Sequence, residues 1–484
     1  MSMLYAIAFP VLASLLLLFR AVSVRMRRIY VMAVTVITAV LALYALFTSL
    51  GKAPLVLLEL SGRLSLAFHV DGLTCVFGIM VAILWPLASL YALEYMSREG
   101  EEDRFFALYL ISFGVTLGIA FSANILTMYL FYELLTLSTL PLVMHSLDGK
   151  ARYAGRVYLI YSMSGAALGF IAMVFLIRYG APMFLLGGEL VIPPSVDANI
   201  LRLAYVFGFF GFGVKAAVFP GHRWLLRASV APTPVTALLH AVAVVKAGVF
   251  AVARITWYGF GTDLLEGSWA QMLVMAAACF TIVYGSARAL HSHHLKRRLA
   301  WSTVSNLSYI LLGIVTLTTA GLVAAMTHMV FHAFIKITLF FGAGAVHYQV
   351  HRDYVPEIEG YGLHMPVVFG TFTVASLGLM GIPPLAGFSS KWLLATACTA
   401  LETPLGYVGA AALIASAILT ALYLMRVVMR AFFPRNGHEL PADAGRCDPN
   451  WYMLVPLVVL AAASVLLGLG ANWVVRLITQ LILG

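Results

Sequence analysis

The chain has 484 residues, of which 62% are hydrophobic and only 10% are charged, and its formal net charge is +10. So little charge over this length excludes a soluble globular protein and indicates a polytopic membrane protein. Because a run of about 20 apolar residues crosses a bilayer as a helix, the sequence predicts an all-α bundle of about 14 transmembrane helices. They lie near residues 2–20, 29–50, 72–93, 104–121, 124–145, 153–178, 200–220, 233–257, 269–287, 299–318, 320–346, 364–399, 405–430 and 451–470.

The loops between these helices carry an orientation signal. When successive loops are assigned alternately to the two sides of the membrane, twenty Lys and Arg residues fall on one side and six on the other. Because cytoplasmic loops carry the basic excess, this split places both termini outside, in a multi-pass protein of the cell (inner) membrane. The positive charge therefore reflects topology in the lipid bilayer, and it argues against nucleic acid as a partner.

Two predicted helices are interrupted, and each interruption has a lysine beside it. Lys215 comes just before the first break, and Lys391 comes just after the second. The breaks are formed by Pro220 and Gly221 and by Pro383 and Pro384. Interrupted helices in transporters commonly surround the site at which ions bind.

The two breaks occupy matching places in the order of helices. If each unit has five helices, each break falls in the fourth helix of its unit. Because five is odd, the second unit is inserted upside down relative to the first, as in transporters built from inverted repeats. The predicted divisions are N-terminal helices over 1–103, two five-helix repeats over 104–258 and 259–430, and a loop with the last helix over 431–484.

Glu133 and Lys215 are ionisable residues in otherwise apolar helices. A charged side chain at the bilayer centre costs about 2.5–3.5 kcal/mol, so such residues face protein or water and are functional by default. We expect Glu133 to pair with Lys215, so that loosening of the pair lets the lysine release its proton. The alternative is a static pair that only joins two helices.

His240 and Lys246 lie on the next predicted helix. Imidazole both accepts and donates a proton near neutrality, so His240 is a candidate relay between the two lysines that flank the first break. The alternative is a histidine that is bonded to a backbone carbonyl and has no part in transfer.

Three more titratable residues, His328, His332 and Lys336, are spaced by four residues. This spacing places them on one stripe of a helix, about 6 Å apart at each step. With water between them they form a predicted proton wire, and Lys391 ends the series. A zinc site is disfavoured, because the two histidines have no further ligands at a matching spacing.

Other candidate sites have simpler explanations. Asp71 precedes a predicted helix and is expected to cap it rather than to line an entrance. His291, His293 and His294 lie beside basic residues, which favours a solvated loop over a metal site. The cysteines form no CxxC motif, so neither an iron–sulfur cluster nor a disulfide framework is indicated. We therefore expect no metal, no cofactor and no catalytic redox site in the chain itself.

Six stretches together give the chain a specific resemblance to a known family. They are Phe131–Leu135, Val214–Leu225, Ala231–His240, Leu295–Ser305, His332–Lys336 and Gly381–Lys391. Through them the chain resembles the proton-conducting, antiporter-like membrane subunits of respiratory complex I (L, M and N types), of Mrp cation/proton antiporters (A and D types) and of membrane-bound hydrogenases. The resemblance covers predicted helices 3–13. It implies 14 helices with both termini outside, and other membrane subunits as partners.

The resemblance also implies roles for individual residues. Glu133 and Lys215 match the regulated ion pair of the family. The central relay matches Lys246, His328, His332 and Lys336, and the residue that opens to the far side matches Lys391. One stretch departs from the family, because Leu226 and Arg227 stand where Pro-Asp is usual, and this alters the predicted inside mouth.

These observations predict a proton-translocating subunit of a multisubunit complex, with exchange for Na⁺ left open. The complex itself is left open between an oxidoreductase, such as a hydrogenase or a complex I-like assembly, and an Mrp-type antiporter. Two alternatives have different functions. One is a structural or assembly subunit without transport of its own, and the other is a stand-alone secondary transporter.

Overall fold

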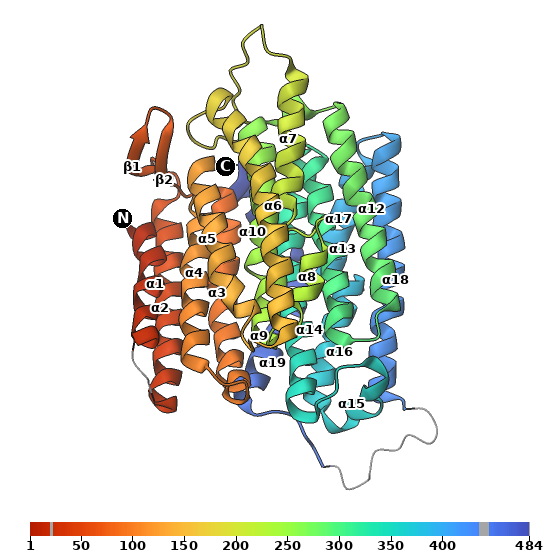
Figure 1. Ribbon diagram of the computed structural model, residues 1–484. Helices are drawn as coiled ribbons and strands as arrows, with labels where there is room; N and C mark the ends of the chain where they lie inside the picture. Colours follow the sequence, from red (N-terminus) through yellow and green to blue (C-terminus); the bar gives the residue numbers. More distant parts are fainter. Residues whose placement is uncertain (20–22, 435–444, 484) are drawn as a thin grey trace.

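Apolar runs form helices along the whole chain, because every backbone N–H and C=O group in hydrocarbon must find its partner within the protein. The computed structural model describes residues 1–19, 23–434 and 445–483. Within these ranges, eleven helices are long and apolar enough to cross a membrane, and they run side by side along one axis (Figure 1). The prediction of a helical, multi-pass membrane protein is confirmed.

Each of the predicted segments coincides with one helix or with two or more consecutive helices. The exact number of 14 spans stays a prediction, since three of the segments are too short or too polar to meet the same criteria of length and hydropathy. The predicted end of the first helix at residue 20 and residues 435–444 of the predicted polar loop lie outside the described residues.

The N-terminal part contains an element that the sequence analysis did not predict. Its elements are α1 (Ser2–Phe19), α2 (Val24–Ser49), β1 (Leu55–Ser61), β2 (Leu64–Phe68), α3 (Gly72–Tyr95) and the short η1 (Met96–Arg98). The two strands form an antiparallel hairpin above the ends of the helices (Figure 1). Its apolar runs are too short to span a bilayer, and Gly62 allows the tight turn with a φ of 52°.

The next part of the chain contains the first break. Its elements are α4 (Glu102–Ala120), α5 (Ile125–Val143), α6 (Gly149–Tyr179), α7 (Ala198–Gly213), α8 (Arg223–Ala228), α9 (Thr233–Ala241), α10 (Val244–Ala253) and the π-helix η2 (Arg254–Phe260). The predicted break between α7 and α8 is present. A further interruption at Val242 and Ala243 separates α9 from α10, and it was not predicted because neither residue is a helix breaker.

The second break lies in the following part of the chain. Its elements are α11 (Thr262–Leu265), α12 (Trp269–His291), α13 (Leu295–Val315), α14 (Thr319–Val350), η3 (Val355–Ile358), α15 (Tyr361–His364), α16 (Pro366–Met380), α17 (Ala386–Thr399) and α18 (Pro404–Phe432). The predicted break between α16 and α17 is present. The segment from α9 to η2 and the helix α14 form the core, with 100% and 94% of their most apolar stretches buried.

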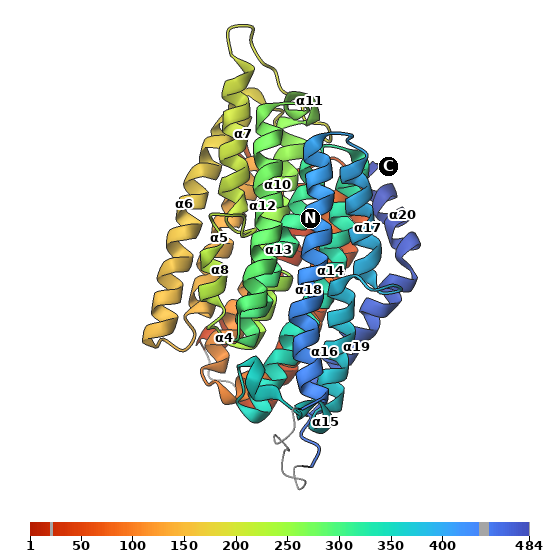
Figure 2. The same cartoon turned by 90° about the vertical axis from the view of Figure 1, so that its right-hand side faces the viewer.

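The last predicted helix corresponds to α19 (Trp451–Leu469). A further helix that was not predicted, α20 (Ala471–Leu483), follows it after Gly470. Both lie on the flank opposite α6 (Figure 2). A Cβ atom on Gly468 would lie 2.3 Å from the carbonyl oxygen of Pro384, so α19 is packed directly on the second break.

Two arginines that the charge count assigned to loops are almost completely buried. Arg254 is 1% exposed within η2, and Arg298 is 1% exposed in the first turn of α13. Arg298 donates to the carbonyl oxygen of Tyr423 at 2.8 Å. A buried arginine that is hydrogen-bonded is a weaker marker of orientation than an exposed one, and the placement of both termini outside stays a prediction.

Asp71 caps α3 as predicted, since its Oδ1 accepts from the N–H of Thr74 at 2.9 Å. The same carboxylate also forms a bidentate ion pair with Arg254, with Nη2 donating to Oδ1 at 2.8 Å. Arg254 Nη2 donates to Thr74 Oγ1 as well, at 2.8 Å. The pair ties the start of α3 to the helix that leads back to Lys246.

Replacement of Asp71 by Ala should lower the free energy of unfolding by about 3–5 kcal/mol, because it leaves the buried Arg254 without its counter-charge. Asp197→Ala is the matched control. Asp197 caps α7 through the N–H of Asn199, and the loss of an exposed cap costs only about 1 kcal/mol. Denaturant unfolding in detergent measures both variants. Equal losses would show that the ion pair adds nothing beyond the cap.

Candidate functional site

Lys215 lies in the segment that connects α7 to α8 and is fully buried. Its Nζ donates to the backbone carbonyl of Tyr132 on α5 and lies 3.4 Å from the centroid of the Tyr132 ring. The chain turns sharply here, and Ala217 has a φ of 56°, in the left-handed region that costs an L-residue roughly 1–2 kcal/mol. The contacts around this segment therefore stabilise the interruption between α7 and α8.

Helix α10 supplies part of those surroundings. Gly248 lies against the break, and a Cβ atom at this position would come within 2.4 Å of the backbone nitrogen of Ala216. Only glycine permits this approach of two backbones. Lys215 is therefore fixed between α5 and α10, the helix that carries Lys246.

Glu133 follows Tyr132 on α5 and is partly buried. Its Oε1 is enclosed without a hydrogen bond. Among the described side chains, no ion pair within 4.0 Å joins Glu133 to Lys215, because the lysine contacts the residue before it instead. The structure brings the two expected partners to neighbouring positions without direct contact.

The second break places Lys391 against the end of the preceding helix. Its Nζ donates to the carbonyl oxygens of Leu379 at 2.6 Å and of Met380 at 3.2 Å. These are carbonyls of the last turn of α16, which has no following turn to bond them. A cation is also the favoured charge at a helix C-terminus. Gly381, with a φ of 89°, ends α16 in the left-handed conformation.

Between the two breaks, four side chains form a connected series. Lys246 Nζ lies 2.8 Å from His332 Nδ1, and the ring centroids of His332 and His328 are 5.8 Å apart. His328 Nδ1 lies 2.9 Å from Ser390 Oγ. Ser390 directly precedes Lys391, so the series runs from α10 through α14 to the second break.

The Nε2 atoms of both histidines are buried without a hydrogen bond. Each ring therefore has one nitrogen engaged in the series and one free to take part in it. Tyr309 on α13 lies beside this segment, with its ring centroid 5.3 Å from that of His328 and 5.3 Å from Lys391 Nζ.

Lys336 leaves this series, although it shares the stripe of α14 with the two histidines. Its Nζ donates to the carbonyl oxygen of Leu299 at 2.8 Å and also to Ser302 Oγ, both on α13. The expected order along α14 is thus replaced by a branch, in which His332 contacts Lys246 and Lys336 points to another helix.

His240 lies at the end of α9, before the interruption that separates it from Lys246. Its ring centroid is 4.8 Å from that of Phe340, and Lys336 Nζ is 5.6 Å from the same ring. His240 is therefore on the side of Lys336, and no hydrogen bond joins it to Lys246 within the described part of the chain.

Sequence reasoning missed the hydroxyl groups of the site. Ser390, Ser302 and Tyr309 are buried, and each contacts one of the predicted titratable residues. Serine and tyrosine are common in membrane helices, so only the positions of Ser390 beside Lys391 and of Ser302 in the stretch Leu295–Ser305 could have signalled these two residues, and Tyr309 had no such signal. Leu226 and Arg227, which depart from the pattern of the family, lie in α8, and the guanidinium group of Arg227 is 5.4 Å from the centre of the Tyr153 ring.

Comparisons with known proteins match the chain to two families. The family described as NADH:quinone oxidoreductase/Mrp antiporter, TM, matches residues 122–420. The family described as NADH-Ubiquinone oxidoreductase (complex I), chain 5 N-terminus, matches residues 59–106.

Three relatives span different kinds of complex. NADH-quinone oxidoreductase subunit N of Desulforudis audaxviator is 31% identical over 83% of this chain and 81% of its own length. The A/B component of a probable K(+)/H(+) antiporter of Rhizobium meliloti is 30% identical over 84% of this chain and 40% of its own. Hydrogenase-4 component B of Escherichia coli is 30% identical over 84% and 63%. The chain thus spans less than two thirds of the last two.

Two solved structures share the fold. One is the membrane-bound sulfane sulfur reductase (MBS), an archaeal respiratory membrane complex, with a TM-score of 0.84. The other is the Mrp complex from Dietzia sp. DQ12-45-1b, with a TM-score of 0.83. In each case the sequence identity is 20%, and 99% of this chain and 96% of the other are covered.

Gly248→Ala should displace the break beside Lys215 and lower the free energy of unfolding by about 1–3 kcal/mol, because the new methyl group meets backbone that cannot move aside freely. Gly370→Ala on α16 is the control, since a Cβ atom there meets nothing within 4 Å. Unfolding of both variants in detergent tests this packing. A Gly248 variant as stable as the control would contradict it.

Proposed function

Because the chain belongs to the NADH:quinone oxidoreductase/Mrp antiporter family of membrane proteins, we propose that it translocates protons as one subunit of a multisubunit membrane complex. The observation that carries this proposal is the connected series from Lys246 through His332 and His328 to Ser390. Buried titratable groups are costly in a membrane, and a row of them at close spacing marks a path along which protons can pass.

Transfer along the series follows from the chemistry of its members. Lys246 can donate a proton to His332 Nδ1, with which it is in hydrogen-bond contact. An imidazole that gains a proton on one nitrogen can release one from the other. The step from His332 to His328 spans a ring separation of 5.8 Å, which one bridging water can close. Ser390 then passes the proton toward Lys391 at the second break.

The first break supplies the other end of the proposed path. Lys215 holds the carbonyl of Tyr132 in this structure, while Glu133 is adjacent and has an oxygen without a hydrogen bond. A rotation of Glu133 toward the ammonium group would form the regulated pair. Lys215 would then alternate between a carbonyl and a carboxylate, which bind its charged form with different strength.

The surroundings of the proposed subunit follow from its family. We infer other membrane subunits as partners and the cell membrane as location, with both termini outside. We also infer that residues 104–258 and 259–430 are inverted five-helix repeats, each with its break. Protons are the proposed cargo, and exchange for Na⁺ or K⁺ would depend on the partner subunits.

Lys246→Ala should reduce proton translocation by at least tenfold, since it removes the donor to His332. A pH-sensitive dye in inverted membrane vesicles that contain the assembled complex measures the flux. Lys52→Ala is the control, because Lys52 is exposed in the loop before β1. If the chain is only a structural subunit, the variant should alter assembly and leave the proton flux per assembled complex unchanged. That result would contradict the proposal that the chain translocates protons.

Ser390→Ala should slow translocation several-fold while the complex still assembles, because the serine bonds His328 at one end of the series. Ser390→Thr keeps the hydroxyl group and should retain most of the flux. Equal rates for the Ala variant and the unchanged chain would show that the proton does not pass this serine.

A further inference from the structure

An apolar groove of about 510 Å³ lies on the outer surface of the bundle between α6 and α7, and the first break forms one of its ends. Apolar side chains such as Leu168 and Phe210 line it. A Cβ atom on Gly165 would lie 2.7 Å from the carbonyl oxygen of Gly211, so the two helices are in contact along its floor. The groove therefore faces outward, toward the surrounding hydrocarbon, and is closed toward the protein interior.

The groove lies directly against the segment that carries Lys215. Val214 lines the groove, and its carbonyl oxygen accepts a hydrogen bond from Trp224 Nε1 at 2.7 Å. The Trp224 ring packs on Tyr158 of α6, with the ring centroids 5.0 Å apart. A molecule in the groove therefore contacts the first break from outside, while Lys215 contacts α5.

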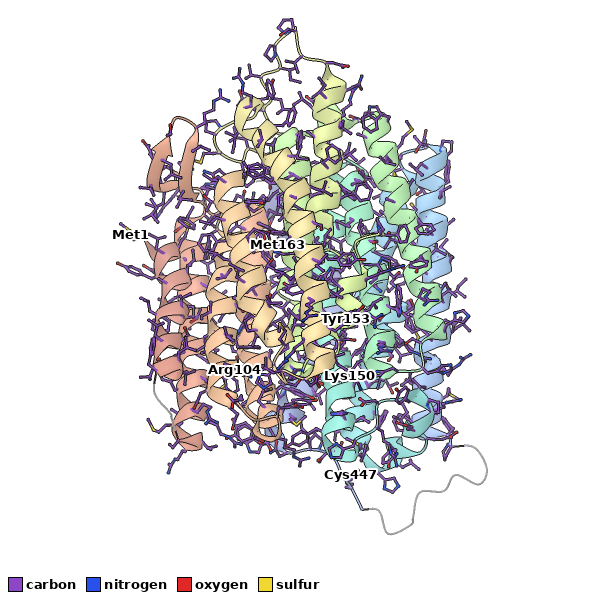
Figure 3. The ribbon with its side chains drawn as sticks, in the orientation of Figure 1. Met1, Arg104, Lys150, Tyr153, Met163 and Cys447 are labelled. Atoms are coloured by element: carbon purple, nitrogen blue, oxygen red, sulfur yellow. The ribbon has the colours of Figure 1, made fainter. Side chains whose placement is uncertain are left out.

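Basic side chains gather beyond the end of the groove at the break. Arg223 and Arg227 are exposed on one side of α8, which follows the break directly. The guanidinium group of Arg227 lies 5.4 Å from the centre of the Tyr153 ring on α6. Arg156 is exposed one turn further along α6, on the same side as Tyr153. Figure 3 shows Tyr153 on the lower part of α6, above Lys150.

These arginines present uncompensated positive charge. Among the residues that the structure describes, no carboxylate lies within 4.0 Å of Arg156, Arg223 or Arg227. Arginine binds phosphate through paired N–H donors, and tyrosine is enriched at the level of lipid headgroups. Arg227 also stands where an aspartate is usual in the family, so attraction of an anion here is a property of this chain.

The spacing of the basic cluster and the groove fits one lipid molecule. Tyr161, where the groove begins on α6, follows Tyr153 by eight residues, which is about 12 Å of helix. Leu168 follows Tyr153 by fifteen residues, which is about 22 Å. One leaflet with its headgroups is about 20–22 Å deep. A phosphate beside Tyr153 therefore places an acyl chain along the whole groove.

We propose that the groove and the arginines beside it form a binding site for one anionic phospholipid. Its phosphate is bound by Arg223 and Arg227, and one acyl chain lies between α6 and α7. The site does not depend on the proposed function, because lipid binding requires only the charge and the shape of this face. The bound chain contacts Val214 and so supports the interruption that positions Lys215.

A phosphatidylglycerol that carries a photoactivatable diazirine in its acyl chain tests this site. The assembled complex is placed in phosphatidylcholine nanodiscs with this probe, and peptide mapping locates the label. The groove residues of α6 and α7 should be labelled several-fold more by this probe than by the matching phosphatidylcholine probe. Arg227→Gln should lower labelling by phosphatidylglycerol about fivefold, which is the effect of one basic residue at an anionic membrane surface.

Arg178→Gln is the matched control and should leave the labelling unchanged. Arg178 is exposed at the opposite end of α6, and its guanidinium group also lies near a tyrosine ring, 5.5 Å from the centre of Tyr179. Arg227→Lys keeps the positive charge and should retain most of the labelling. Leu168→Trp narrows the groove and should lower labelling by both probes.

Two results would overturn the proposal. If both probes label the groove equally and Arg227→Gln changes neither, the groove accepts any lipid chain and the arginines do not recognise a phosphate. If neither probe labels the groove in the assembled complex, another subunit covers this face and no lipid is bound there.

Discussion

The structure depends on how lysine side chains are stabilised inside a hydrocarbon-facing bundle. Among the described residues, neither Lys215 nor Lys391 has a carboxylate in contact, and both amino groups donate to backbone carbonyls. At the second break, the carbonyls come from the interruption itself, because a helix that ends inside the membrane leaves its last oxygens without partners. The break and the lysine thus compensate each other. Removal of either would leave an unsatisfied group in a medium that cannot solvate it.

The same constraint explains why the centre of the molecule is so fully enclosed. The segment from α9 to η2 and helix α14 carry His240, Lys246, His328, His332 and Lys336, and they are the most buried of the eleven described helices that are long and apolar enough to span a membrane. The outer helices α1, α2, α6, α12, α18 and α19 present apolar side chains outward and shield these groups from lipid. The titratable residues therefore lie away from lipid, and their contacts are determined by the packing of the protein alone.

Much of the fold could be predicted from the sequence, because the bilayer sets the length of each helix and proline or glycine marks most interruptions. The breaks at Pro220 and Pro383 were predicted for that reason. The cap formed by Asp71 was predicted because an aspartate directly precedes an apolar helix. The hairpin β1–β2 and the interruption at Val242 were not, since short apolar strands and ordinary helix formers give no such signal. Residue types also identified the titratable groups. Their connections could not be predicted, because the branch of Lys336 to Ser302 depends on how α13 and α14 pack.

The interruption between α9 and α10 has a consequence for motion. Val242 and Ala243 are compatible with an unbroken helix, so only the packing of neighbouring helices prevents the two segments from joining. Closing this joint would turn His240 relative to Lys246, since each residue added to a helix rotates the next by about 100°. The interruption at Val242 and Ala243 is therefore a hinge, and the angle between α9 and α10 depends on the packing of neighbouring helices rather than on a proline or glycine kink. Any change of charge that shifts α14 can be transmitted through it to the orientation of a histidine.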